Sequence, residues 1–313
     1  MDFSEFITPI SEEVFYSRHD PNDIRLGDRV YREFADYSKS SVVLLGCPQD
    51  IGIKRNKGRT GSRFAPFEIR KYLYRYPLSI DHQHLRLIDL GDVKIQDSLE
   101  DTHEILYKLV RQFIQDGKLV IVLGGGNDIS YPDCAALSSD VNPILVFNID
   151  RHLDVRADQI RNSGTPYRQL LEEKLIEPDL FHEFGINSYA NSETYIKYIE
   201  NIGSHIHTLG DVRNQINKII SDILKNSDVE GIFWGFDIDV VRAIEAPGVS
   251  DPGPMGITAR EICEIADFAA RDPRTRLIEI TEVNPEYDID GITCKLAANI
   301  IVRALVRENS YQD

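Results

Sequence analysis

Acidic side chains and a histidine follow two apolar runs of the chain at short, regular spacing. The run Pro143–Ile149 leads into Asp150-Arg151-His152-Leu153-Asp154, and the run Gly231–Phe236 leads into Asp237-Ile238-Asp239. Side chains two residues apart point the same way in an extended chain. We therefore expect four carboxylates and one imidazole to converge at one place, namely those of Asp150, His152, Asp154, Asp237 and Asp239.

Such a cluster is suited to metal binding. Converging carboxylates repel one another, and without a cation some of them would have to take up protons. A pair of divalent ions removes this cost, and oxygen-rich ligation with an imidazole suits Mn²⁺ or a similar hard-to-borderline metal. The alternative is that each Asp-x-Asp pair only caps a helix or faces solvent. Two such pairs, each directly after an apolar run, favour the metal site.

Two further apolar runs are followed by loops that could approach a ligand. Leu119–Leu123 is followed by Gly124-Gly125-Gly126-Asn127-Asp128, whose spacing fits neither the dinucleotide fingerprint nor the P-loop. Glycines there let the backbone come close to a ligand. Ser41–Gly46 precedes a polar loop over 56–62, which has the composition of an anion-binding loop. A plain surface loop with turn glycines explains that segment equally well.

These residues need a scaffold, and the chain predicts one built from alternating strands and helices. Eight segments read as strands, at Ser41–Gly46, Leu85–Leu90, Leu119–Leu123, Pro143–Ile149, Leu180–Ile186, His205–Leu209, Gly231–Phe236 and Arg276–Glu282. Amphipathic segments between them read as helices, at Ala65–Tyr76, Leu99–Asp116, Ser192–Ile202, Asp211–Lys225, Thr258–Arg271 and Leu296–Arg307. This alternation predicts an α/β fold with one mostly parallel sheet between helices. We expect residues 1–40 to be an N-terminal extension packed on a single domain, 41–313.

Composition limits the classes of function. The chain has 313 residues, with 35 Lys and Arg against 51 Asp and Glu, and a net charge of −16. So acidic a protein lacks the cationic surface that binds nucleic acid or anionic membranes. The N-terminus has no signal-peptide pattern, and no run is long enough to span a bilayer. The four scattered cysteines fit reduced thiols, so we expect a cytoplasmic protein.

Three segments together resemble signature blocks of the ureohydrolases, the superfamily of arginase, agmatinase and formimidoylglutamase. Asn148–Arg156 resembles the DAHxD block, Phe236–Val241 the SFDxD block and Leu123–Asp128 the GGxH block. Shorter matches occur at Gly58–Gly61, Ser163–Tyr167, Ala246–Ser250 and Glu282–Pro285, so the resemblance covers about residues 40–307. The SGTPY and APGVS segments are most similar to the formimidoylglutamase branch.

The resemblance implies a three-layer α/β/α sandwich around an eight-stranded, mostly parallel sheet, and two manganese ions. Asp150 and Asp237 would bridge both ions. His152 and Asp239 would complete the ligands of one ion, while Asp154 would bind the other.

The resemblance also implies catalytic residues and a reaction. Asp154 would assist proton transfer to the leaving nitrogen, and Glu282 would hold the amidinium of the substrate. The candidate substrate-binding residues are Arg59, Arg156, Ser163, Thr165 and Glu282. The reaction would be hydrolysis of a linear amidine C–N bond, such as formiminoglutamate to glutamate and formamide.

Two positions depart from the family pattern. Asn127 stands where the GGxH block supplies a His ligand, and Arg151 stands where the family has Ala. An amide oxygen can ligate a hard cation, but it is a weaker donor than imidazole. Three alternatives stay open: two metals with Asn127 as a ligand, one metal at the His152 and Asp239 site, or a metal-poor, non-catalytic subunit. Arg151 either pairs with a nearby acid or partly replaces the lost cation.

The expected partners follow from the same resemblance. They are a small-molecule amidine or guanidino substrate and further copies of this chain, in a trimer or hexamer. The net charge of −16 would not steer a dianionic substrate such as formiminoglutamate toward the protein. A cationic guanidino substrate therefore remains an alternative.

Overall fold

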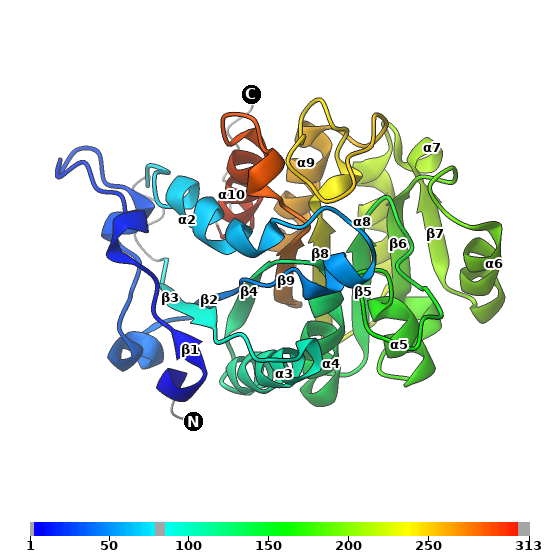
Figure 1. Ribbon diagram of the computed structural model, residues 1–313, viewed down its shortest axis with the longest axis horizontal. Coiled ribbons are helices and arrows are strands. Elements are labelled where there is room, and N and C mark those ends of the chain that lie inside the picture. Colours follow the sequence, from blue (N-terminus) through cyan, green and yellow to red (C-terminus); the bar gives the residue numbers. More distant parts are fainter. Residues whose placement is uncertain (1–2, 79–84, 306–313) are drawn as a thin grey trace.

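A single nine-stranded sheet forms the centre of the computed structural model, which describes residues 3–78 and 85–305. Its strands follow the order β1-β3-β2-β4-β9-β8-β5-β6-β7 (Figure 1). They are β1 (Ile7–Thr8), β2 (Val42–Cys47), β3 (Leu87–Val93), β4 (Leu119–Gly124), β5 (Ile144–Ile149), β6 (Phe181–Ile186), β7 (His205–Thr208), β8 (Gly231–Asp237) and β9 (Thr275–Thr281). Among the strands of the described residues, only β1 runs antiparallel to its neighbour in the sheet.

The predicted fold class is confirmed, and each of the eight predicted strands is present, most of them within one or two residues of the expected ends. The ninth strand, β1, was not predicted because two residues leave no pattern to detect. It pairs with β3 and so joins the segment before residue 41 to the sheet. The central strands β2, β4, β5 and β8 are almost entirely buried, which explains their unbroken apolar runs.

Helices cover both faces of the sheet and make the fold three-layered (Figure 1). One face carries α2 (Ala65–Leu73), α8 (Ile216–Asn226), α9 (Ala259–Arg271) and α10 (Ile292–Leu305). The other carries α3 (Leu99–Gln115), α4 (Ser130–Asp140) and α5 (Pro166–Glu172). The short α1 (Ile51–Arg55) follows β2, and α6 (Glu193–Ile202) and α7 (Leu209–Val212) flank β7.

Helices α1, α4 and α5 were not predicted, and the physical reason is clearest for α4. Seven of its eleven residues are buried, so it shows no contrast between an apolar and a polar face. The predicted helix Asp211–Lys225 is divided in the structure, because α7 ends at Val212 and α8 begins at Ile216. Thr258 caps α9 together with Glu261, as its TxxE sequence indicates.

The strand order opens a crevice at one edge of the sheet. Strands β4 and β5 are successive in the chain, yet β9 and β8 lie between them. The loops after β4 and β5 therefore lead in different directions, which is where parallel α/β sheets bind ligands. The segments that carry chemistry follow these four neighbouring strands: Asn127 after β4, Asp150–Asp154 after β5, Asp239 after β8 and Glu282 after β9.

Within residues 3–78 and 85–305, no helix is both long enough and apolar enough to cross a membrane. The cysteines Cys47, Cys134, Cys263 and Cys294 are all buried and free.

A pair of histidines at the edge of the sheet predicts how stability depends on pH. His182 on β6 lies 3.0 Å from His207 on β7, between Nδ1 and Nε2. Burial lowers the pKa of His182 to about 3 and that of His207 to about 4, helped by the neighbouring His205. In the unfolded chain both titrate near 6.5. The unfolded state therefore binds more protons below about pH 6.5, and stability falls as the pH falls.

We expect His182→Phe to weaken this dependence, because phenylalanine does not titrate and can stack on Phe147, whose ring lies 5.6 Å from that of His182. The parent should lose about 1–2 kcal/mol more free energy of unfolding than the variant between pH 7.5 and pH 5. Urea unfolding of both proteins at the two pH values measures this. Equal losses in the two proteins would contradict the assignment.

Candidate metal centre

The five converging side chains form two groups whose ligand atoms lie close enough to hold a metal ion. One group is Asp150, His152 and Asp239, and the other is Asp150, Asp154 and Asp237. In each group the ligand atoms all lie within 4.8 Å of one another. Asp150 belongs to both groups, as a residue that bridges two ions would.

The turns that position these side chains have the same hydrogen bond after β5 and after β8. The Asp150 Oδ1 accepts a hydrogen bond from the backbone N of His152 at 2.7 Å, and the Asp237 Oδ1 accepts one from the backbone N of Asp239 at 2.9 Å. The side chain of each Asp thus closes a tight turn with the backbone two residues later. The extended conformation that the spacing argument assumed is wrong for Ile238–Val240, which forms a 3-10 helix, although the predicted convergence is observed.

Two buried oxygens in the centre have no hydrogen-bond partner, namely Asp150 Oδ2 and Asp239 Oδ1. A buried, unpaired carboxylate oxygen costs free energy unless a proton or a cation compensates it. Burial and the neighbouring carboxylates raise the pKa of Asp237 and of Asp154 well above the usual range. Burial raises the pKa of Asp239 to about 6. The donor set and its unpaired atoms therefore fit divalent cations.

His152 is held between carboxylates on both sides of its ring. Its Nδ1 lies 3.2 Å from Asp239 and 3.4 Å from Asp150, and its Nε2 lies 3.2 Å from Asp251. Burial lowers the pKa of His152, but the attraction of these carboxylates outweighs burial and raises it. Because Nε2 faces Asp251, the Nδ1 is the nitrogen that faces the first ligand group. A carboxylate that fixes the ring of a ligating histidine is a common feature of metal sites.

Arg151 points away from the ligands and holds the loop that carries Asp251. Its guanidinium donates to the backbone O of Asp251 at 3.0 Å and lies 3.6 Å from the Asp251 carboxylate. It also packs against Gly253, where a Cβ atom would come within 2.6 Å of it. Pairing with a nearby acid is thus the alternative that the structure favours for Arg151.

Asn127 lies beside the second ligand group, directly after β4. Its Nδ2 donates to Asp154 Oδ2 at 2.6 Å, and its Oδ1 accepts from Ser130 at 2.8 Å and from Thr281 at 3.1 Å. Asn127 is therefore within reach of the ligands, with the nitrogen end of its carboxamide facing them.

Glu282 is positioned by the glycine run after β4. Its backbone N donates to Gly125 O at 2.9 Å, and its Oε1 accepts from the backbone N of Asn127 at 2.7 Å. No other residue fits at Gly125, because a Cβ there would lie 1.9 Å from Gln49 O. The φ of Glu282 is +64°, a costly conformation for a non-glycine residue that often marks functional sites. Burial raises the pKa of Glu282 to about 8, against the lowering effect of a short hydrogen bond from Ser250.

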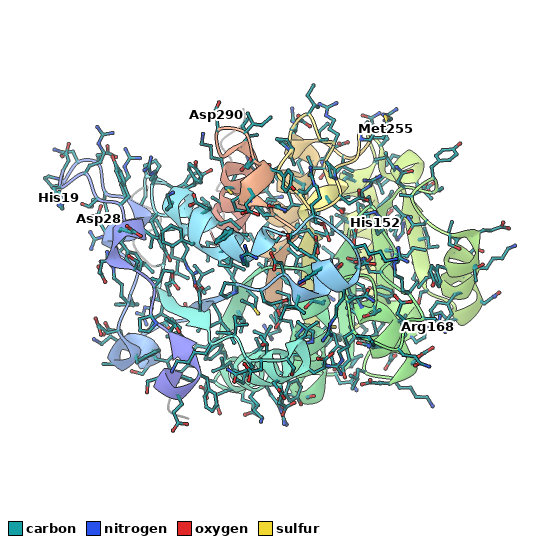
Figure 2. The ribbon with its side chains drawn as sticks, viewed as in Figure 1. His19, Asp28, His152, Arg168, Met255 and Asp290 are labelled. Atoms are coloured by element: carbon teal, nitrogen blue, oxygen red, sulfur yellow. The ribbon has the colours of Figure 1, made fainter. Side chains whose placement is uncertain are left out.

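Four of the five ligand residues, His152, Asp154, Asp237 and Asp239, line a cavity of about 610 Å³. Figure 2 shows His152 near the middle of the molecule, with Met255 and Arg168 on opposite sides of it. Of the predicted substrate-binding residues, Arg59, Arg156, Ser163 and Glu282 all line this cavity.

Thr165 is the exception among the predicted substrate-binding residues. It is buried and does not line the cavity, because its hydroxyl is bonded to the backbone of Asn162 at the start of α5. Arg55, which precedes Arg59 in the chain, pairs with Glu100 at 2.6 Å and does not line the cavity.

The polar loop over 56–62 supplies part of the cavity wall. Asn56 donates to Ser163 Oγ at 3.0 Å, and Arg59 donates to Val249 O at 2.6 Å. Lys57 and Arg156 are exposed there, and their side chains have no hydrogen-bond or ion-pair partner within the described part of the chain. Two free cations therefore line the same cavity as the acidic ligands.

Several cavity residues were not predicted from the sequence. Asp251, Asn191 and Tyr195 line the cavity as well. Asn191 accepts from the backbone N of Leu153 at 3.0 Å and donates to Arg151 O at 2.8 Å, so it holds the ligand loop from outside. No local signal marks these residues, although Asp251 directly follows the APGVS segment.

A three-layer α/β/α fold with two carboxylate-rich ligand groups at the carboxyl edge of its sheet defines the ureohydrolase class. Residues 40–306 match the model of the Arginase family, and the chain belongs to this family. The resemblance predicted from the sequence is confirmed.

The relatives within this family carry a narrower name. The chain is 31% identical over 279 residues to a formimidoylglutamase of Rhodococcus jostii, covering 85% of this chain and 86% of that one. A structure of Trypanosoma cruzi formiminoglutamase with Mn²⁺ matches with a TM-score of 0.83 and 29% identity, over 90% of this chain and 97% of the other. Bacillus subtilis formimidoylglutamase matches with a TM-score of 0.84, 29% identity and 93% coverage of both.

Proposed function

We propose that this chain is a manganese-dependent formimidoylglutamase, which hydrolyses formiminoglutamate to glutamate and formamide. Family membership, the names of the relatives and the manganese in a related structure support the reaction class and the metal. The observation that carries the substrate assignment is the pair of free cations, Lys57 and Arg156, on the wall of the cavity that the metal ligands line.

The ligands of the centre would be divided as the geometry groups them. Asp150, His152 and Asp239 would hold one ion, and Asp150, Asp154 and Asp237 the other. When bound, the ions would lower the pKa of a water molecule and stabilise the charge that develops on the heteroatoms of the tetrahedral transition state.

The remaining chemistry belongs to side chains of the protein. The Glu282 carboxylate faces the cavity and would pair with the amidinium of the substrate, which relieves the cost of its own burial. Asp154 lines the cavity, so its carboxylate is placed to carry a proton to the leaving nitrogen. The φ of Asp154 is +46°, a costly conformation for a non-glycine residue that often marks functional sites.

The charge distribution removes the objection that a net charge of −16 raises against a dianionic substrate. Steering depends on the local field of a cleft more than on total charge. The carboxylates of glutamate would meet Lys57 and Arg156 on the wall, and the amidine would reach the metal ligands. A guanidino compound such as agmatine would bring a cationic amine, in place of carboxylates, beside these two free cations.

Metal content and product release test this function together. We expect the purified chain to take up Mn²⁺ and then to release formamide from formiminoglutamate, but neither urea from arginine nor urea from agmatine. A chain that binds no manganese and turns over none of these compounds would be the metal-poor, non-catalytic homologue. Urea release from a guanidino compound alone would support the other substrate class.

Arg156→Ala should weaken the use of formiminoglutamate by about 10- to 100-fold in kcat/KM, mainly through KM. A charge-assisted hydrogen bond to a carboxylate contributes about 1.5–3 kcal/mol, and it would be lost equally from the ground state and the transition state. Steady-state kinetics measure the change.

Arg161→Ala is the matched control for this variant. Arg161 lies five residues along the same loop but stacks on the ring of Tyr131 at 4.0 Å, outside the cavity. We expect less than a twofold change there. An Arg156→Ala enzyme with an unchanged KM would show that this guanidinium does not hold the substrate.

A further inference from the structure

A buried polar chain connects Asn127 to two carboxyl groups beneath the metal centre. The hydroxyl oxygen of Ser130, on α4, lies 2.8 Å from Asn127 Oδ1 and 2.5 Å from Glu279 Oε1, both within hydrogen-bond distance. Glu279, on β9, is fully buried and lies against the carboxyl group of Asp133, which is also fully buried on α4. These residues touch no substrate cavity, and the proposed reaction gives them no role.

The Ser130 hydroxyl decides which end of the Asn127 carboxamide faces the ligands, because it has one proton and two neighbours that accept. If that proton goes to Asn127, the amide oxygen stays with Ser130 and the amide nitrogen faces Asp154, as in the structure. If the proton goes to Glu279, the serine oxygen can only accept on its other side. The amide nitrogen then turns to Ser130, and the amide oxygen turns to the ligand group.

Asp133 favours the second arrangement. Burial raises the pKa of both carboxyl groups, that of Asp133 well above its usual range and that of Glu279 to about 7, so Asp133 is the one that keeps the proton of this pair. Glu279 is then the charged acceptor of the pair, and a hydroxyl bonded to a carboxylate makes the stronger, shorter bond. The 2.5 Å separation between Ser130 Oγ and Glu279 Oε1 is of that kind. Thr281, which also contacts Asn127, has a hydroxyl that accepts as readily as it donates.

We propose that Glu279 is a positioning residue that draws the Ser130 proton and thereby turns the Asn127 carboxamide oxygen toward Asp150, Asp154 and Asp237. The chain would in this way make an amide serve as an oxygen ligand at the second ligand group. This inference rests on the metal centre proposed above.

Glu279→Gln tests the proposal, because the two side chains have the same shape. The amide nitrogen introduced by this substitution would donate to Ser130, and Ser130 would then donate to Asn127, which fixes the amide nitrogen of Asn127 toward Asp154. We expect the variant to bind one Mn²⁺ normally and the second about 10- to 100-fold more weakly, the usual cost of changing a residue behind a metal ligand. Titration calorimetry with MnCl₂ gives both affinities, and the electron paramagnetic resonance signal of a coupled manganese pair should be lost at limiting metal.

Two comparisons separate positioning from a general effect on the fold. Glu183→Gln is the matched control: Glu183 is equally buried beneath the centre but bonds Asn148 at 2.8 Å and not Asn127. It should leave the affinity for the second ion unchanged. In an Asn127→His background there is no amide to turn, so Glu279→Gln should no longer lower the affinity for the second ion.

The outcomes distinguish this inference from the proposed metal centre. A parent chain that takes up no manganese overturns both. If the parent binds two ions, two results would overturn only the inference. In the first, the Glu279→Gln variant binds both ions as tightly as the parent. In the second, Glu279→Gln lowers the affinity for the second ion as much in the Asn127→His background as beside the native asparagine. A parent that saturates at one ion also overturns the inference alone.

Discussion

Asp150→Asn is expected to remove metal from both ligand groups and to lower kcat/KM by at least about 1000-fold, which corresponds to about 4 kcal/mol of transition-state stabilisation. Asp150 is the one residue common to the two groups, and its Oδ2 is buried without a partner. An amide at this position offers only a neutral oxygen and removes one negative charge from the centre. Two cations that share this carboxylate would lose affinity together.

The fold should survive this change, which makes the result interpretable. The Asp150 Oδ1 accepts from the backbone N of His152, and an asparagine oxygen can accept the same bond. We would measure manganese per chain by elemental analysis after dialysis, and kcat/KM with formiminoglutamate. Circular dichroism of the same samples reports whether the fold is intact.

Asp251→Asn provides a graded comparison for Asp150→Asn. Asp251 is exposed and contacts the centre only through His152 Nε2 at 3.2 Å. Changing a residue that contacts a metal ligand typically costs about 10- to 100-fold in metal affinity or activity. We therefore expect Asp251→Asn to lose clearly less activity than Asp150→Asn. If Asp150→Asn kept two ions per chain, or lost no more activity than Asp251→Asn, Asp150 would not bridge the two groups.

Much of the architecture was predictable because its signals are local. Strands buried on both faces, such as β2 and β5, must be continuously apolar, and the chain shows this directly. The ligands that follow β5 and β8 were predictable for a related reason, since a parallel sheet brings the carboxyl ends of neighbouring strands to one edge. The short turns at Asp150 and Asp237 then achieve the convergence that a simple alternation of side chains was expected to give.

The parts that could not be predicted depend on partners far apart in the chain. Ser130 meets Glu279 across 149 residues, and neither sits in a pattern that marks it as polar support for the centre. Asp251 reaches His152 from a loop 99 residues away. Thr165 shows the converse problem: its segment resembles the family, but its hydroxyl is bonded to the backbone of Asn162 and does not reach the cavity. A family resemblance predicts which residue types occur at a site more readily than it predicts the direction in which each side chain points.

A second network, remote from the cavity, carries the largest expected effect on stability. Arg70 on α2 is fully buried and donates to both oxygens of Asp89, at 2.8 and 3.0 Å, to Asp92 at 2.6 Å and to Gly91 O at 2.9 Å. Tyr74 donates a short hydrogen bond to the same Asp89 carboxylate. Burial disfavours the charged guanidinium, but the two carboxylates outweigh burial and raise the pKa of Arg70. The network thus ties α2 to β3 beneath the N-terminal segment.

Arg70→Met should lower the free energy of unfolding by about 3–5 kcal/mol, because it leaves the buried Asp89 carboxylate without its counter-charge. Methionine fills similar space, so the loss measures the uncompensated charge more than a cavity. Adding Asp89→Asn should restore part of the stability, since removing both charges is less costly than removing one. Urea unfolding of the single and double variants measures both changes.

Arg111→Met, at an exposed pair with Asp140, should stay within about 1 kcal/mol of the parent. Either of two results would show that the buried pair does not hold α2 against β3. Arg70→Met would lower the free energy of unfolding no more than Arg111→Met does, or adding Asp89→Asn would lower it further.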